Sequence, residues 1–272
     1  IGVLEVLEEE GLLPDTIIGC SAGAIIGGLY ALHANANAVK MVLLPKSSSA
    51  FLEFHVADFP FGLFSNSGLE RFLQKEFGNK RFQDLEIPFI SVATNLQNGE
   101  LYPFFTGPVV KPILASSAIP GAFNPVEIYG TYFVDGGVKD PVPVKTARDM
   151  NAKVVIAVEI QEQLSNEPPS NLLDIMWRSL SINYYALSKQ NAKLADVLVE
   201  IPISDVGLFS DNQNVNLYLT GRKKAIAALP PGGTAVVPGR SAELESFLGR
   251  GDVTIRRFDP ADVELGDPVT RF

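Results

Sequence analysis

The sequence predicts an α/β fold: a central, mostly parallel β-sheet covered by helices on both faces, which makes three layers. Short runs of β-branched residues alternate along the chain with longer segments whose apolar residues have helical spacing. This alternation is typical of sheets whose strands are connected by helices. The chain has 272 residues, of which 46% are hydrophobic, and it contains one cysteine, Cys20. It is long enough to bury one large core without disulfides.

The expected elements follow this pattern from the first residue onward. A helix over residues 1–10 ends near Gly11, because glycine favours helix termination. The β-branched run Thr16-Ile17-Ile18 predicts a buried strand, and the apolar segment after it predicts a helix over 22–33. Alternating or β-branched runs predict further strands at 88–94, 100–104, 131–134, 153–159 and 197–201. Segments of helical periodicity predict further helices at 67–77, 141–150, 171–195 and 216–229.

The sequence changes in character after Pro230-Pro231-Gly232-Gly233. Beyond this point we expect a short strand, a helix around 242–248 and a strand around 253–258. Residues 231–272 are therefore interpreted as a small C-terminal α/β extension, and no residue in it suggests chemistry. On the last helix before it, the basic run Arg222-Lys223-Lys224 is interpreted as a solvated face.

The pentapeptide Gly19-Cys20-Ser21-Ala22-Gly23 has the G-x-S-x-G pattern of a nucleophile elbow and lies between an expected strand and an expected helix. Glycine is expected at both ends because the strained turn leaves no room for a Cβ. The turn presents the Ser21 hydroxyl at a helix N-terminus, where free N–H groups favour developing negative charge, and the Ala22 N–H is the expected oxyanion donor. The alternative is that Gly19, Gly23 and Gly27 only allow close helix packing. Cys20 is interpreted as a small buried hydrophobic residue.

Two histidines, His33 and His55, are the only candidates for the base of a Ser-His-Asp triad. In α/β-hydrolases the histidine follows the serine and the acid along the chain, but neither histidine lies near the C-terminus. His33 lies twelve residues beyond Ser21, which is about 18 Å along a continuous helix. His55 lies among phenylalanines and is interpreted as structural. A triad, and with it a general esterase of that kind, is therefore disfavoured.

Asp135 is the candidate that replaces histidine as the base. It ends a β-rich run and precedes Gly136-Gly137, so we expect it at the carboxyl end of a strand, where Ser21 is also expected. It can accept the proton of a serine only if burial raises its pKa from about 3.9. The alternative is an ordinary Asp-Gly turn. Asp140 is a weaker rival, because it precedes Pro141 and fits the N-cap of a helix.

Four motifs occur in order along the chain: Ile1-Gly2-Val3-Leu4-Glu5-Val6-Leu7, the Gly19-Cys20-Ser21-Ala22-Gly23 elbow, Ala115-Ser116-Ser117-Ala118-Ile119-Pro120-Gly121, and Asp135-Gly136-Gly137 followed by Pro141-Val142-Pro143. In order and spacing they resemble the patatin-like phospholipases over about residues 1–230. The resemblance implies that Ser21 is the nucleophile and that Asp135, in its Asp-Gly-Gly motif, is the base. It also implies hydrolysis of lipid acyl esters, commonly of phospholipids or lysophospholipids, through an acyl-enzyme and without a metal or cofactor.

The resemblance also predicts the domain organisation, with a patatin-like catalytic domain over residues 1–230 ahead of the extension 231–272. Members of the family carry a glycine-rich loop before the first of these motifs, and its N–H groups form the oxyanion hole. The sequence begins at Ile1, so we expect the first strand and this loop to be missing from it. Loss of oxyanion donors lowers turnover strongly. The alternative function is therefore a catalytically silent acyl-lipid binding or regulatory protein on the same fold.

Composition narrows the partners further. A net charge of −9 argues against nucleic acid. The expected partner is a lipid or acyl ester substrate, and peripheral membrane contact and a homo-oligomer are both compatible with the sequence. The longest apolar runs are well below the roughly 18–20 residues that span a bilayer, and the acidic start is no signal peptide. We expect a cytoplasmic location, with or without peripheral contact to a membrane. No cluster of Cys, His and carboxylates has the spacing of a metal site.

The segment 51–64 contains five phenylalanines. Phe59, Phe61 and Phe64 flank a proline and a glycine, which suggests a loop that could close over an acyl chain. Packing in the core is the favoured alternative, because aromatic side chains more often fill interiors than bind ligands. We expect Ser116, Ser117 and Pro120 to shape the wall of the cleft and not to supply a second nucleophile.

Overall fold

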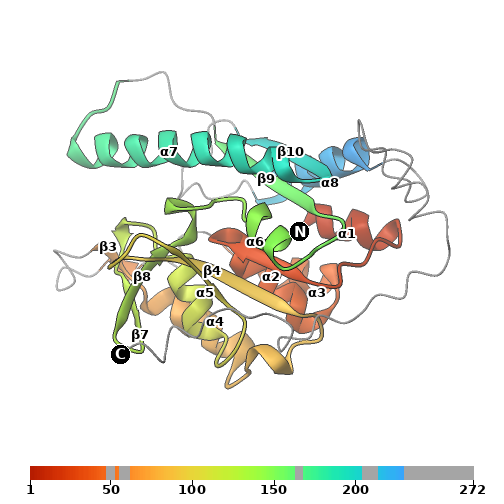
Figure 1. Ribbon diagram of the computed structural model, residues 1–272, viewed down its shortest axis with the longest axis horizontal. Coiled ribbons are helices and arrows are strands. Elements are labelled where there is room, and N and C mark those ends of the chain that lie inside the picture. Colours follow the sequence, from red (N-terminus) through yellow and green to blue (C-terminus); the bar gives the residue numbers. More distant parts are fainter. Residues whose placement is uncertain (47–52, 55–61, 163–167, 204–213, 230–272) are drawn as a thin grey trace.

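The computed structural model describes residues 1–46, 53–54, 62–162, 168–203 and 214–229 (Figure 1). Its helices are α1 (Gly2–Glu9), α2 (Ala22–His33), α3 (Ala36–Leu43), α4 (Ser67–Phe77), α5 (Val110–Ser116), α6 (Val144–Asp149), α7 (Leu172–Asn191) and α8 (Asn214–Ala228). Its strands are β1 (Ile17–Cys20), β2 (Glu53–Phe54), β3 (Gly62–Ser65), β4 (Phe89–Asn95), β5 (Leu101–Phe104), β6 (Gly121–Phe123), β7 (Val126–Ile128), β8 (Thr131–Asp135), β9 (Ile156–Glu162) and β10 (Val197–Ile203). Short 3-10 helices follow Arg81, β8 and α7: η3 (Phe82–Asp84), η4 (Gly136–Val138) and η5 (Ala192–Leu194).

The predicted α/β class is confirmed, and α2 and α4 begin and end at the predicted residues. Two helices, α3 and α5, lie outside the predicted elements. Asn35 is a signal for α3, because its side-chain oxygen accepts a hydrogen bond from the Ala38 N–H at 2.8 Å and caps the helix. Pro112 obscures α5, since proline is usually read as a helix breaker. It lies in the first turn, however, where a missing N–H costs no intrahelical hydrogen bond.

The main sheet has the strand order β1-β4-β8-β7, and β5 also pairs with β4. The sheet is mixed: β1 runs parallel to β4, whereas β5 and β8 run antiparallel to it. β9 and β10 form a separate parallel pair, and β3 joins β2 and β6 in a small sheet. β4 therefore separates the strand that leads into the elbow from the strand that leads into the Asp-Gly-Gly motif.

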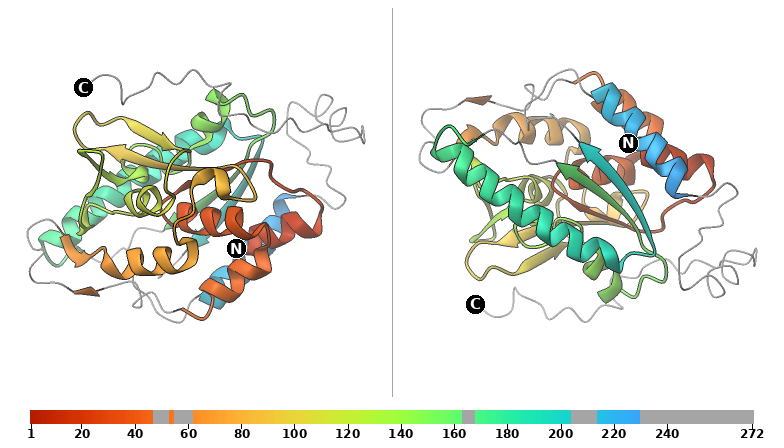
Figure 2. Two further views of the ribbon diagram at one scale, coloured as in Figure 1. Left: turned by 90° about the horizontal axis from the view of Figure 1, so that it is seen from below. Right: turned by 90° about the horizontal axis from the view of Figure 1, so that it is seen from above.

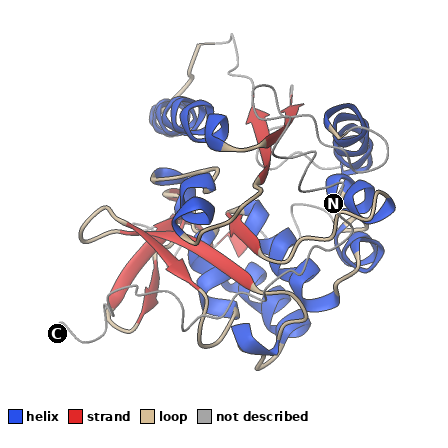
Figure 3. Cartoon of the chain, turned by 45° about the vertical axis from the view of Figure 1, so that its right-hand side comes forward, coloured by secondary structure: helices blue, strands red, loops and turns tan. Residues whose placement is uncertain are grey.

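β4 is buried on both faces, which accounts for the layers. Phe89 and Ala93 belong to a hydrophobic cluster shared with α2, α4 and α5. Ile90 and Val92 point to the opposite face, because side chains alternate along a strand, and they pack against Met150 after α6. Figure 3 shows helices on both sides of the strands. The prediction that helices cover both faces of the sheet is confirmed.

α1 and α8 lie side by side although they come from opposite ends of the described chain (Figure 2). Their backbones approach closely at Gly2, where a Cβ would lie 2.3 Å from the Tyr218 carbonyl oxygen and 2.7 Å from the backbone nitrogen of Arg222. Val6 of α1 packs in one cluster with Val199 of β10 and with α8. Only glycine allows this contact, so the packing of α8 explains the residue at position 2.

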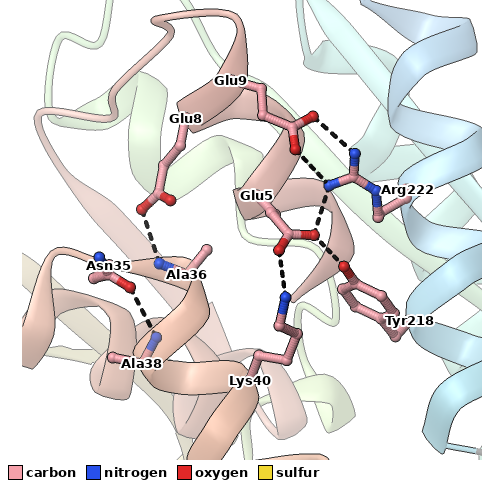
Figure 4. Close-up of polar contacts among 9 residues, drawn as sticks. All are labelled: Glu5, Glu8, Glu9, Asn35, Ala36, Ala38, Lys40, Tyr218 and Arg222. Carbon is pink, nitrogen blue, oxygen red and sulfur yellow. Dashed lines mark hydrogen bonds and ion pairs between the residues drawn. The ribbon is translucent and has the colours of Figure 1, made fainter.

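A polar network at the same contact ties α1 to α3 and α8 (Figure 4). Glu5 accepts hydrogen bonds from Lys40 at 2.6 Å, from Arg222 at 2.5 Å and from the Tyr218 hydroxyl. Glu9 forms a second ion pair with Arg222 at 2.8 Å. Burial raises the pKa of Glu5, but its three partners outweigh burial and lower that pKa to about 2. Arg222 thus belongs to this network, and the predicted solvated face is wrong for this residue.

We expect Glu5→Gln to lower the free energy of unfolding by about 1–3 kcal/mol, because Lys40 and Arg222 lose the charge they share. The lowered pKa means that this contribution is present at neutral pH and is lost as the pH falls below about 4.5, the ordinary value. Urea unfolding followed by circular dichroism measures the change, with Glu127→Gln at the exposed position of β7 as the control. Equal unfolding midpoints for the two variants would contradict a stabilising network.

Among the described residues, no helix has the length and apolar character needed to cross a membrane. The extension 231–272 and the phenylalanines Phe59 and Phe61 lie outside the described residues. The elements and the domain boundary predicted around residue 230 stay predictions. Phe64 packs with Phe123 at a ring distance of 6.1 Å, in a cluster that includes Trp177 of α7. For Phe64 this contact supports the core interpretation.

Candidate active site

Ser21 occupies a strained turn between the end of β1 and the start of α2. Its φ of 54° and ψ of −125° form a conformation that residues with a Cβ rarely adopt. A Cβ on Gly19 would lie 2.5 Å from the Gly23 carbonyl oxygen, so glycine is required at position 19. A Cβ on Gly23 would meet nothing within 4 Å, so the predicted steric need for glycine there is wrong. Close helix packing applies at Gly27, where a Cβ would lie 2.9 Å from the Ile17 side chain.

Ser116 and Ser117, at the end of α5, hold the backbone of the elbow. The Ser21 N–H donates a hydrogen bond to Ser116 Oγ at 3.0 Å, and the Ser117 hydroxyl donates to the Ser21 carbonyl oxygen at 3.2 Å. Both supporting serines are buried. The Ser21 N–H is therefore occupied, whereas the Ala22 N–H lies in the first turn of α2, where N–H groups have no intrahelical partner. The sequence around Ser21 does not indicate these two hydrogen bonds, because the partner serines are 95 and 96 residues away along the chain.

Asp135 ends β8 and is completely buried, with 0% of its surface exposed. Its Oδ1 accepts a hydrogen bond from the Gly137 N–H at 2.7 Å, and its carbonyl oxygen accepts one from the Thr94 hydroxyl at 3.0 Å. Gly136 allows the close approach to β4, since a Cβ there would lie 2.5 Å from the Val92 carbonyl oxygen. An ordinary surface turn would leave the carboxylate in water, so this alternative does not account for its burial.

The register of β4 brings the two motifs together. Cys20, the last residue of β1, pairs with Val92, and Asp135, the last residue of β8, pairs with Ala93. Ser21 directly follows β1, and Asp135 is the last residue of β8. The two residues therefore lie on opposite sides of β4, at about the same position along it. Both residues lie at the carboxyl ends of their strands, as predicted. Because β8 runs antiparallel to β4, these two strand ends meet beside the middle of β4.

The surroundings of Asp135 raise the pKa of its carboxyl group, as a general base requires. Burial raises the pKa of Asp135 to about 6, while the Ser21 side chain and the Gly137 N–H act in the opposite direction. Its Oδ2 has no hydrogen-bond partner of ordinary geometry within the described part of the chain. Cys20 Sγ lies 4.0 Å from Oδ1, and burial together with this carboxylate raises the pKa of the thiol well above its usual range. Cys20 is buried, as predicted, and remains neutral.

Asp140 does not cap a helix, so that prediction is wrong. α6 begins at Val144, and its N-cap is Pro143. Asp140 is buried, and its Oδ1 accepts a hydrogen bond from Asn191 at the end of α7 at 2.6 Å. Burial raises the pKa of Asp140 to about 6 as well, but its side chain serves to connect the segment before α6 to α7.

His33 is the one histidine among the described residues, and it lies away from Ser21 and Asp135. α2 continues to His33, which is exposed at the opposite end of that helix from Ser21. The prediction that His33 is too far from Ser21 is confirmed. His55 lies outside the described residues. In the described ranges, no three His, Cys, Asp or Glu side chains gather into a group that could hold a metal ion.

Comparison with known proteins agrees with the resemblance to the patatin-like phospholipases that the sequence motifs indicate. The family model described as patatin-like phospholipase matches residues 1–148, a stretch that contains both Ser21 and Asp135. The mouse patatin-like phospholipase domain-containing protein 6 is 32% identical over 170 residues, which are 60% of this chain and 12% of the mouse protein. Lysophospholipase NTE1 of Cryptococcus neoformans is 30% identical over 165 residues, which are 59% of this chain and 10% of the fungal protein.

A bacterial relative is closer in size. An uncharacterized NTE family protein of Mycobacterium tuberculosis is 32% identical over 163 residues, which are 59% of this chain and 44% of that protein. The matched segment thus spans less than half of each of these three relatives.

Proposed function

Because the chain belongs to the patatin-like phospholipase family, we propose that it hydrolyses acyl esters of lipids, with Ser21 as the nucleophile and Asp135 as the general base. One observation carries the proposal: a buried carboxylate with a raised pKa lies beside a serine on a strained turn. Lysophospholipids are the substrates we favour, since one similar protein is named a lysophospholipase. A lipid substrate also implies contact with a membrane or micelle surface.

In the acylation step, Ser21 Oγ attacks the acyl carbon of the ester while its proton passes to Asp135. The carbonyl oxygen becomes an oxyanion, for which the Ala22 N–H at the start of α2 is one donor. The bond between the acyl carbon and the ester oxygen then breaks, and the proton held by Asp135 passes to the departing alcohol oxygen. The product is an acyl-enzyme ester on Ser21 and a free alcohol.

Deacylation reverses these roles. A water molecule attacks the acyl carbon and gives one proton to Asp135. The bond between the acyl carbon and Ser21 Oγ breaks, and the proton returns from Asp135 to the serine. The raised pKa of Asp135 suits both directions, because a base near pKa 6 can accept a proton and later release it close to neutral pH.

A lipid screen with the full-length protein tests the proposal. Lysophosphatidylcholine, phosphatidylcholine and monoacylglycerol of one acyl chain are incubated with the wild type and with Ser21→Ala, and free fatty acid is measured by mass spectrometry. We expect release by the wild type only. EDTA should leave the rate unchanged, because the proposed chemistry uses only side chains and backbone N–H groups of the protein and no metal ion. A loss of activity that calcium restores would indicate a metal-assisted mechanism instead. Lipid binding without fatty acid release would favour the silent binding protein.

A further inference from the structure

Two buried oxygen atoms, one on the proposed base and one next to it, have no hydrogen bond of ordinary geometry within the described residues. Within the described residues, the side-chain polar atoms that are buried without a hydrogen bond are Asn66 Oδ1, Asn124 Oδ1, Asp135 Oδ2 and the Tyr184 hydroxyl. Buried polar groups in folded proteins are almost always hydrogen-bonded, so an orphaned atom in a functional region suggests a ligand that completes it. The last two of these atoms belong to the same region, and Tyr184 has no role in the mechanism described so far.

Tyr184 reaches this region from the middle of α7. A Cβ on Gly137 would lie 3.0 Å from Asp135 Oδ1, 3.0 Å from Tyr184 Cε2 and 3.1 Å from Tyr184 Cζ. The carboxylate and the phenol end of the ring therefore flank the same glycine. α7 is also tied to this loop by Asn183, whose side-chain nitrogen donates to the Val138 carbonyl oxygen at 3.4 Å.

The hydroxyl of Tyr184 keeps its proton at neutral pH and can therefore donate a hydrogen bond. Burial, followed by the charges of Asp135 and Cys20, raises the pKa of Tyr184 well above its usual range, so the group keeps its proton. A phenol that keeps its proton beside a carboxylate can donate a hydrogen bond to any oxygen that approaches that carboxylate. In the proposed reaction one such oxygen must approach, because Asp135 exchanges a proton with it.

We propose that the Tyr184 hydroxyl donates a hydrogen bond to the oxygen that leaves or enters at the acyl carbon: the alcohol oxygen in acylation and the water oxygen in deacylation. This inference rests on the proposed function. Tyr184 transfers no proton itself. It stabilises negative charge on the departing oxygen until Asp135 delivers its proton, whereas the Ala22 N–H acts on the other oxygen, that of the carbonyl. A side chain at Gly137 would crowd the ring, because its Cβ would lie 3.0 Å from Tyr184 Cε2.

The test uses two esters with the same acyl chain and different leaving groups. A nitrophenolate leaves readily without assistance, whereas the glycerol oxygen of a lysophospholipid is a poor leaving group that needs stabilisation. Tyr184→Phe keeps the ring against Gly137 and removes one oxygen. We expect kcat/KM for lysophosphatidylcholine to fall by about 10- to 100-fold, as for loss of a hydrogen bond to a charged oxygen. The acylation burst with the nitrophenyl ester should fall much less.

Tyr185→Phe is the matched control, because Tyr185 is the next residue on α7 and its ring is exposed. It should leave both rates unchanged. An equal fall for both esters in Tyr184→Phe would indicate a structural role, and wild-type rates for both would exclude any role of the hydroxyl. Either result overturns the inference while leaving Ser21 and Asp135 in place. A wild-type protein that cleaves neither ester would instead overturn the proposed function, and this inference with it.

Discussion

Replacing Ser21 with alanine is expected to abolish covalent labelling by a fluorophosphonate and to lower kcat by about four to six orders of magnitude. The reason is that Ser21 Oγ forms the bond to the acyl carbon, and removal of a nucleophile from a cooperating catalytic pair removes most of the acceleration. Intact-protein mass spectrometry of the full-length protein measures the labelling, and fatty acid release from lysophosphatidylcholine measures the turnover.

A second serine variant controls for non-specific effects. Ser179 is exposed on α7, where its hydroxyl donates to the Ile175 carbonyl oxygen at 2.7 Å within the helix. Ser179→Ala should keep both labelling and turnover. If the probe still adds one mass increment to Ser21→Ala, the nucleophile is another residue and the assignment of the elbow fails.

Replacing Asp135 with asparagine is expected to lower kcat/KM by several orders of magnitude while the fold survives. Asparagine keeps the shape of the side chain, and its oxygen can still accept the Gly137 N–H, but it cannot take the proton of Ser21. A short-chain nitrophenyl ester measures the rate. His33→Gln and His55→Gln serve as comparisons and should retain activity. A collapse in His55→Gln with Asp135→Asn near the wild type would establish a histidine base instead.

The pH dependence gives an independent readout of Asp135. The wild-type kcat/KM should rise with pH through about 6 and then level off, because the base must be ionised. Stability should change in the opposite direction. A carboxyl with an ordinary pKa of 3.8 and a native pKa of about 6 destabilises the native state as the pH rises between these values, by about 3 kcal/mol above pH 6.

Asp135→Asn should therefore melt at a higher temperature than the wild type at pH 8, with a smaller difference at pH 5. This result would separate the base from a structural aspartate, whose loss lowers stability at neutral pH. Differential scanning calorimetry of both proteins at the two pH values provides the measurement. A variant that is both inactive and less stable at pH 8 would show that Asp135 holds the fold rather than the proton.

Much of the secondary structure was readable from the sequence where local signals agree. α4 matches its predicted bounds because apolar spacing and good helix-forming residues indicate the same element. α2 also matches, although it contains Gly23, Gly27 and Gly28, because its apolar run directly follows the elbow. α5 was not predicted, because Pro112 in its first turn is usually read as a helix breaker. The antiparallel direction of β8 was not predicted either, because residue type carries no information on whether a strand runs parallel or antiparallel. Asp140 fitted a local cap signal but formed a contact with α7 instead.

By itself, the sequence determined which residues are candidates for the site. The glycines around Ser21, the Asp-Gly-Gly motif and the positions of the two histidines predict a serine nucleophile and an aspartate base, because these signals depend on residue type and short spacing. Only the tertiary structure decided how they meet. The pairing of β4 with both β1 and β8 brings together residues more than a hundred positions apart, the serines of α5 hold the elbow, and α7 places Tyr184 beside Asp135. Such contacts follow from strand register and long-range packing, which depend on the whole core rather than on any short segment.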